Sequence, residues 1–240
     1  MKIRKNYITI AARIVRYNLK IIFAGKFFWF LVAAFAFFSF FMFQEAWDRN
    51  SEINEGTIYT LLMFPCLLLI FYPIVFGIQN DEDNRILEII FGIPNYRYKV
   101  WGIRMLMVYV ANYFIIVIFA YIARILLYPV NIFEMAWQLI FPMLFFGNLA
   151  FMFTTILRSG NGTAVVMIIL GLFFMIFMNE NSSIKNSMWN VFLNPLTIPR
   201  DMHPTIWQNT ILQSRLFLLI AGVVFLMIGL LNLQKREKFM

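Results

Sequence analysis

The chain has 240 residues, of which 62% are hydrophobic and 13% are charged, whereas ordinary soluble domains have about 45–50% and about 25%. A soluble chain of this length has no core large enough for so much apolar surface, so the composition excludes a soluble globular protein and indicates a membrane protein. The formal net charge of +8 raises the alternative of a nucleic-acid-binding protein, which depends on where the basic residues lie.

Residues 1–25 carry an apolar stripe at helical spacing. The apolar positions alternate at steps of four and three: Ile3, Tyr7, Ile10, Ile14, Tyr17 and Ile21. Arg13, Arg16 and Lys20 fall on another face of the same helix. We therefore expect an amphipathic helix in the membrane interface with its cations toward lipid phosphates. Such a helix serves either as a plain anchor or as an element that transmits motion.

Apolar runs of membrane-spanning length occupy most of the remaining chain. A helix needs about 20 residues to cross roughly 30 Å of hydrocarbon. Six runs meet this length or come close to it, at residues 27–43, 57–78, 105–123, 135–157, 163–178 and 210–233. Pro65 and Pro73 interrupt the second run and Pro142 the fourth, and prolines kink helices and permit bending. We predict an all-α integral membrane protein with six transmembrane helices in a single domain.

The Lys and Arg residues predict the orientation, because loops rich in them stay in the cytoplasm. With both termini cytoplasmic, fifteen lie inside: Lys2, Arg4, Lys5, Arg13, Arg16, Lys20, Lys26, Arg85, Arg97, Lys99, Arg104, Arg158, Lys235, Arg236 and Lys238. Only Arg49, Arg124, Lys185 and Arg200 lie outside, and Arg215 falls within the last run. We predict a multi-pass protein of the cell inner (plasma) membrane with cytoplasmic N- and C-termini. Because the positive charge follows one membrane face, it predicts contact with membrane lipids and no nucleic-acid partner.

The loop at residues 79–99, between the second and third runs, has the most specific pattern. An acidic run at 81–83 opens it, which suits the positive end of a helix. Three isoleucines then share one helical face: Ile86, Ile90 and Ile93. Gly92 and Pro94 mark the end of this short helix. The pattern fits either an amphipathic cytoplasmic helix that a peripheral partner moves or a solvated connector.

This loop resembles the corresponding loop of permeases in the ABC-2 exporter family, where an acidic opening leads through a Gly-Thr-Leu-Glu-like core to Leu-Leu-x-x-Pro and then to basic residues. The matching positions here are Asp81, Asp83, Leu87, Glu88, Ile90, Phe91, Pro94, Arg97 and Arg104. Arg85 stands where the family has glycine, and Ile86 where it has threonine. The six-span plan, the amphipathic N-terminus, the tripeptide 194–196 and the basic tail 235–238 are similar to the same family.

The resemblance implies a transport subunit, not an enzyme. It would form half of a translocation path with a second permease copy or a related permease, and two cytoplasmic ABC ATPase subunits would drive the pair. The coupling residues would be Asp81, Asp83, Leu87, Glu88, Ile90, Phe91, Pro94 and Arg97. This chain has no GxxxxGK[ST] loop, so ATP and Mg are expected on the partner ATPase, with no cofactor, metal or catalytic site here. The apolar and aromatic spans favour export of a hydrophobic or amphipathic substrate.

Polar residues inside the predicted spans are candidates for a substrate path. Arg215 either meets an anionic substrate or extends to the outer headgroups. Asn112 and Asn148 either line the path or hydrogen-bond between helices. The outer segment 179–209 contains an apolar hexapeptide at 188–193 that is too short to span. It therefore forms either short re-entrant helices over the exit or a surface loop.

Two other functions are alternatives to transport. A membrane enzyme acting on lipids needs polar catalytic groups at one depth, and a single histidine, His203, without paired intramembrane carboxylates argues against it. The single cysteine, Cys66, likewise excludes a disulfide framework. A non-transporting anchor or regulator, driven by an ATPase within a larger envelope complex, would share the loop but need no continuous path. The sequence leaves this alternative open.

Overall fold

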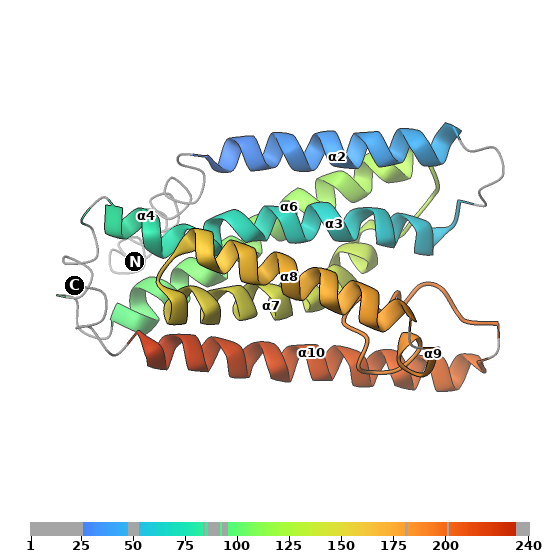
Figure 1. Cartoon of the computed structure of the whole chain (residues 1–240). Coiled ribbons are helices and arrows are strands. Elements are labelled where there is room, and N and C mark those ends of the chain that lie inside the picture. Colours follow the sequence, from blue (N-terminus) through green and yellow to red (C-terminus); the bar gives the residue numbers. More distant parts are fainter. Residues whose placement is uncertain are drawn as a thin grey trace, which may run out of the picture.

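The structure is a computed structural model that describes residues 26–47, 53–83, 85, 92, 96–180, 182–200 and 202–233. Its elements are α2 (Phe27–Trp47), α3 (Glu55–Val75), α4 (Gly77–Asp83), the π-helical turn η1 (Arg97–Gly102), α6 (Ile103–Leu126), α7 (Ile132–Leu157), α8 (Gly160–Glu180), α9 (Ser182–Lys185) and α10 (Pro204–Asn232) (Figure 1). The described residues form no strand and include six helices long and apolar enough to cross a membrane. The predicted all-helical class and the six helices of membrane-spanning length are confirmed for the described residues. The expected interfacial helix at 1–25 and the basic tail lie outside the described residues.

The helices are longer than the predicted spans because their caps lie outside the apolar runs. Asn54 Oδ1 accepts a hydrogen bond from the Thr57 amide at 2.9 Å and begins α3. Asn131 Oδ1 accepts one from the Glu134 amide at 3.4 Å and begins α7. His203 caps α10, and Pro204 follows at the first helical position, where its fixed φ suits a helix. Hydropathy alone does not detect these polar first turns.

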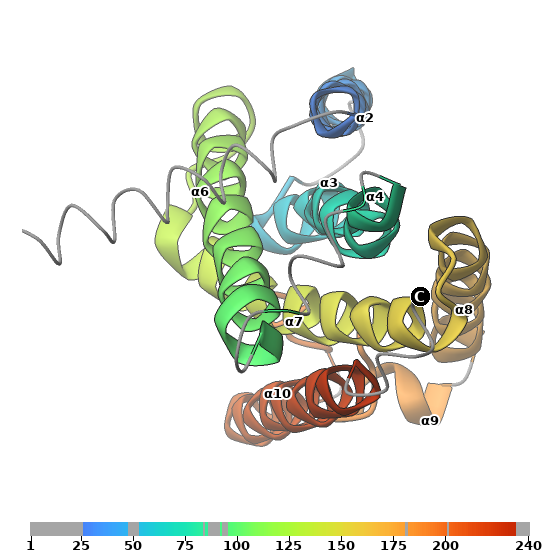
Figure 2. The same ribbon diagram turned by 90° about the vertical axis from the view of Figure 1, so that its left-hand side faces the viewer.

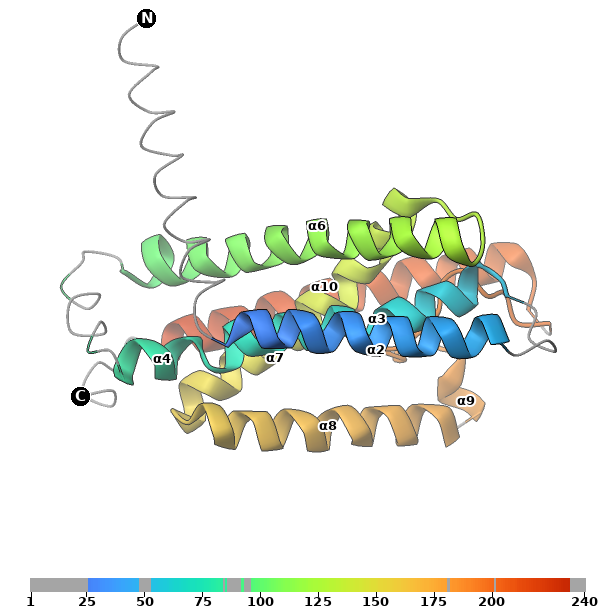
Figure 3. The same cartoon turned by 90° about the horizontal axis from the view of Figure 1, so that it is seen from above.

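The long helices lie side by side, with α4 at one end of the bundle and α9 at the other (Figure 1). We call these the α4 end and the α9 end. The view along the bundle places α3 and α7 in the middle, and the view from above has α6 and α8 on opposite sides (Figures 2 and 3). In the most apolar stretch of α7, 67% of the residues are buried, against 17% in α2 and in α8. The core therefore centres on α3 and α7, while α2 and α8 are peripheral.

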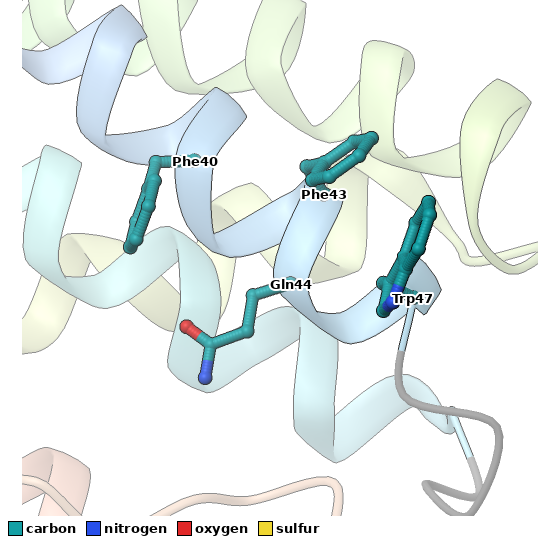
Figure 4. Close-up of a pocket in the computed structure, with 4 residues that line it drawn as sticks. All are labelled: Phe40, Phe43, Gln44 and Trp47. Carbon is teal, nitrogen blue, oxygen red and sulfur yellow. The ribbon is translucent and has the colours of Figure 1, made fainter.

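The outer face of α2 is aromatic and exposed. Phe40, Phe43, Gln44 and Trp47 line a shallow hollow on this helix (Figure 4). The Phe43 and Trp47 side chains are 65% and 76% exposed. The Gln44 amide and the Trp47 indole N–H are the polar groups in this lining, so the hollow has little with which to orient a polar ligand. This face suits contact with lipid tails or with another apolar protein surface.

Candidate functional site

The acidic run lies in the last turn of helix α4, and the short helix predicted after it lies outside the described residues. Helix α3 ends at Val75, and α4 continues beyond it from Gly77 to Asp83. The Asn80 amide donates to the Phe76 carbonyl at 2.9 Å, so the break between the helices is local. Residues 79–83 of the predicted loop are therefore helical, because the helical hydrogen bonding resumes after the break. Carboxylates are unfavourable at the negative end of a helix unless a cation compensates them.

Arg104 supplies this compensation for Asp81. Arg104 Nη1 lies 2.5 Å from Asp81 Oδ2, and the two residues are 8% and 3% exposed. The Trp101 ring packs against the guanidinium, with its centroid 5.2 Å from Arg104 Cζ. A buried ion pair is stable only with close geometry, because both charges lose their hydration. The pair therefore fixes α4 to the beginning of α6.

Gln79 joins the same helix to α8. Its side-chain oxygen accepts a hydrogen bond from the Gly160 amide at 2.8 Å, at the first residue of α8. A Cβ at Gly160 would lie 2.5 Å from Gln79 Oε1 and 2.6 Å from a ring carbon of Phe76. Glycine allows this approach without moving either side chain, and the side-chain oxygen of Gln79 satisfies one of the free N–H groups at the helix start. The α4 helix thus holds the end of a loosely packed span.

Tyr96 connects the other flank of the loop to α10. Its hydroxyl donates to the carbonyl of Leu233, which follows the last residue of α10. Asn232 in turn donates to the Thr155 carbonyl of α7. Together with the bonds of Asp81 and Gln79, these bonds connect residues 79, 81 and 96 to α6, α8 and the end of α10, and Asn232 links α10 to α7. We call this set of contacts the α4-end cluster.

Arg85 has a left-handed backbone conformation, with φ of 56°. Its amide donates to the Glu82 carbonyl at 2.9 Å, which closes the turn after α4. Glycine is the residue that adopts this conformation most readily at the end of a helix. Arg85 occupies the position where the ABC-2 permease pattern has glycine. The backbone here has the geometry that a glycine would favour, although the side chain differs.

Several predicted coupling residues lie outside the described residues: Leu87, Glu88, Ile90, Phe91 and Pro94. Asp83 is exposed at the last position of α4. Arg97 begins the π-helical turn η1, which leads directly into α6. Local π-helical turns are frequent at functional sites because they interrupt the regular hydrogen-bond pattern. The structure therefore brings Asp81 and Arg104 together, and it puts Asp83 and Arg97 on either side of residues 84–96.

Arg215 lies inside the bundle toward the α9 end and is 4% exposed. Its Nε donates to Gln138 Oε1 at 3.0 Å. Its Nη2 donates to the Tyr59 hydroxyl at 3.1 Å and to the Leu193 carbonyl at 3.2 Å. The guanidinium lies 5.8 Å from the Phe141 ring centroid. The sequence allowed Arg215 either to meet an anionic substrate or to extend to the outer headgroups. The buried side chain does not have the extended conformation.

The two predicted asparagines differ in their contacts. Asn148 Oδ1 accepts a hydrogen bond from the Tyr109 hydroxyl at 2.6 Å, which joins α7 to α6. Asn112 is 1% exposed, and its Nδ2 has no hydrogen-bond partner among the described residues. No recorded hydrogen bond within the described ranges links either asparagine to Arg215. Asn148 therefore fits the helix-to-helix alternative, and the three residues do not form one cluster.

The outer segment before α10 reaches deep along the bundle. The Trp189 ring lies 5.0 Å from Phe217 of α10, and the Phe192 ring stacks 5.3 Å from Phe146, near the middle of α7. Asn194 Nδ2 donates to the Gly56 carbonyl at 2.8 Å and to Thr60 Oγ1 at 3.2 Å. Residues 189–193 therefore cover the bundle interior from the α9 end, and Asn194 fastens them to α3.

Comparison with protein-family models, with curated proteins and with solved structures finds no match to this chain. Among the described residues, no group of three or more His, Cys, Asp or Glu side chains is arranged to hold a metal ion. What the geometry offers is mechanical and electrostatic. The α4-end cluster holds several helices together, and Arg215 presents a buried positive charge near the opposite end.

The sequence analysis did not identify all the residues that form the α4-end cluster and the surroundings of Arg215. Gln79, Tyr96, Tyr59 and Gln138 complete the two sites but were not singled out. Gln138 and Tyr59 are polar residues within largely apolar spans, and such residues are costly to bury unless they are hydrogen-bonded. That rule would have marked Gln138 as a candidate, whereas nothing in the local pattern around Tyr96 predicts its contact with Leu233.

Proposed function

We propose that this chain is the permease subunit of an ABC-2 type transporter. It lies in the cell inner membrane with its α4 end and both termini in the cytoplasm. It forms half of a translocation path with a second permease and exports a hydrophobic or amphipathic substrate. Separate cytoplasmic ABC ATPase subunits bind ATP and Mg and drive the change in exposure of the path. The chain itself binds no cofactor and catalyses no reaction.

The connection of the loop's flanks to several spans is the observation that carries this proposal. Asp81 binds Arg104 at 2.5 Å, Gln79 binds the start of α8 at 2.8 Å, and Tyr96 binds the end of α10. A force on residues 84–95 therefore acts on α6, α8 and α10 together. A solvated connector needs no such contacts. The cluster supports the interpretation of the loop as the part that a peripheral partner moves.

The backbone at Arg85 gives separate support. Its φ of 56° coincides with the family's glycine position, so the turn after the acidic residues has the geometry that the family pattern favours. The six apolar helices provide the membrane-spanning body that a permease requires.

The mechanism follows from how differently the helices are packed. Helix α7 is the most deeply buried span, whereas α8 has only 17% of its apolar stretch buried and is held at its first residue by Gln79. Closure of the ATPase subunits on nucleotide would displace the loop and α4. Because a packed core does not deform continuously, the displacement moves the loosely held spans relative to α3 and α7. This motion would open the path on the other side of the membrane.

Reconstitution with the partner ATPase tests the proposal. Glu88→Lys and Phe91→Asp should lower the transport of substrate per ATP hydrolysed, by about tenfold, while the chain still inserts in the membrane. Glu134→Lys, which changes an exposed charge at the α9 end, should leave the ratio unchanged. Unchanged coupling in both loop variants would contradict the proposal. Coupled ATP hydrolysis without movement of any solute would favour the non-transporting anchor.

A further inference from the structure

We propose that Arg215 is the headgroup site for an amphiphile that carries an oxyanion, either a phosphate or a carboxylate. The inference rests on the proposed function where it takes this amphiphile to be the transported substrate. The binding itself does not depend on an ATPase and is measured on the purified chain.

Arg215 is a buried charge without a described counter-charge. Its recorded hydrogen-bond partners, Gln138 Oε1, the Tyr59 hydroxyl and the Leu193 carbonyl, are all neutral. Its Nη1 is buried and has no partner among the described residues. A guanidinium within a membrane span is costly, and most such residues pair with an anion or serve a substrate path. The arrangement therefore leaves one strong donor for a ligand.

The free donor lies on an edge of the guanidinium that can bind an oxyanion with two parallel hydrogen bonds. Nη1 and Nη2 form a planar fork that matches two oxygens of a phosphate or carboxylate. At present Nη2 binds two neutral oxygens, including the Leu193 carbonyl at 3.2 Å. An oxyanion would take the free Nη1 and replace that carbonyl on Nη2. The neutral contacts would thus give way to a charge-assisted bidentate pair.

The surroundings favour a headgroup with an apolar tail over a free ion. The rings of Phe141 and Tyr59 lie 5.8 Å and 6.0 Å from the guanidinium. Next to Arg215 along α10, Leu212 and Leu216 are 61% and 51% exposed on the outer surface of the bundle. A tail attached to a bound headgroup would therefore continue along apolar surface, whereas a small hydrated anion gains nothing from it.

The segment that carries Leu193 controls access. Asn194 fastens it to the Gly56 carbonyl at 2.8 Å and to Thr60, and Trp207 Nε1 donates to the Pro195 carbonyl at 3.4 Å. These are neutral hydrogen bonds, and each contributes little net stability because water replaces it when it breaks. Release of the segment would uncover Arg215 at the α9 end. The site is therefore entered when the Asn194 contacts break.

Lipid binding to the purified full-length chain in neutral detergent tests the inference. The probes are dioleoylphosphatidic acid, dioleoylglycerol, which has the same tails without the phosphate, and inorganic phosphate. The phosphatidic acid should bind, and the other two should bind at least about tenfold more weakly. Arg215→Gln should weaken its binding by about tenfold or more, since it removes a charge-assisted fork. Arg124→Gln removes an exposed charge and should change binding less than about twofold.

A second variant keeps the test decisive if Arg215→Gln does not fold. Asn194→Ala should speed association of the phosphatidic acid several-fold, because it frees the covering segment, whereas Asn209→Ala at an exposed position of α10 should not. Equal affinity of the wild type and Arg215→Gln, or an unchanged association rate in Asn194→Ala, would overturn the site. Equal binding of inorganic phosphate would overturn the assignment to an amphiphile. If the wild-type chain reconstituted with the ATPase shows no coupled hydrolysis but keeps its Arg215-dependent binding, the permease proposal fails and the site stands.

Discussion

Breaking the ion pair between Asp81 and Arg104 should lower the free energy of unfolding far more than removing both charges. The atoms Nη1 and Oδ2 are 2.5 Å apart, and the residues are 8% and 3% exposed. Removing one partner of such a pair leaves a buried charge unpaired, which costs roughly 3–5 kcal/mol. We expect Asp81→Asn and Arg104→Gln each to lose about this amount. The double variant should lose less than either, because the two amides are neutral and hydrogen-bond to each other.

The assay is a double-mutant cycle on purified protein in micelles, with unfolding followed by the loss of helical circular dichroism as denaturing detergent is added. The predicted coupling free energy is at least about 3 kcal/mol. Glu82→Gln and Lys99→Gln, at exposed positions of the same region, form the control cycle and should couple by less than about 0.5 kcal/mol. A coupling below about 1 kcal/mol for Asp81 and Arg104 would refute the reasoning that the pair fastens α4 to α6.

Two further substitutions test the packing. Gly160→Ala should lower the thermal midpoint of unfolding by several degrees, because its Cβ would lie 2.5 Å from Gln79 Oε1. The control variant Gly162→Ala, whose Cβ has no atom nearer than 3.5 Å, should leave the midpoint unchanged or raise it. Equal midpoints of the two variants would contradict the close approach of α4 and α8. Asn148→Leu should cost about 1–3 kcal/mol of unfolding free energy, because it leaves the Tyr109 hydroxyl without its acceptor at 2.6 Å, and Asn148→Leu combined with Tyr109→Phe should recover part of the loss. No recovery in that pair would mean that the hydrogen bond is not what Asn148 contributes.

The spans were predictable from the sequence because each is a long apolar run. Their ends were not, because Asn54, Asn131 and His203 begin helices with side-chain hydrogen bonds that leave no trace in hydropathy. The helical conformation of residues 79–83 was not predicted, for a related reason. Charged residues look like a loop, but here Asp81 is neutralised by a residue 23 positions away. A helix can therefore continue through residues that would end an apolar span.

The candidate sites, like the helix ends, could be predicted only in part from the sequence. Arg215 was recognisable as a charge within a span, but its surroundings come from Gln138 and Tyr59, which are 77 and 156 residues away. Such partners are set by how α3, α7 and α10 pack together. The resemblance to ABC-2 permeases marked Asp81 and Arg104 as separate positions in a motif, and it did not predict that they bind each other.

The most direct test of the account is the location of residue 91 and what touches it. A photoreactive benzoylphenylalanine replaces Phe91 in the full chain, and a second variant carries it at Phe133, which is 69% exposed at the α9 end. After irradiation of native membranes, the account predicts that position 91 forms an adduct with a nucleotide-hydrolysing ABC subunit and that position 133 does not. Adducts of position 91 only with lipid, or with proteins on the outer side, would contradict the coupling role of the loop.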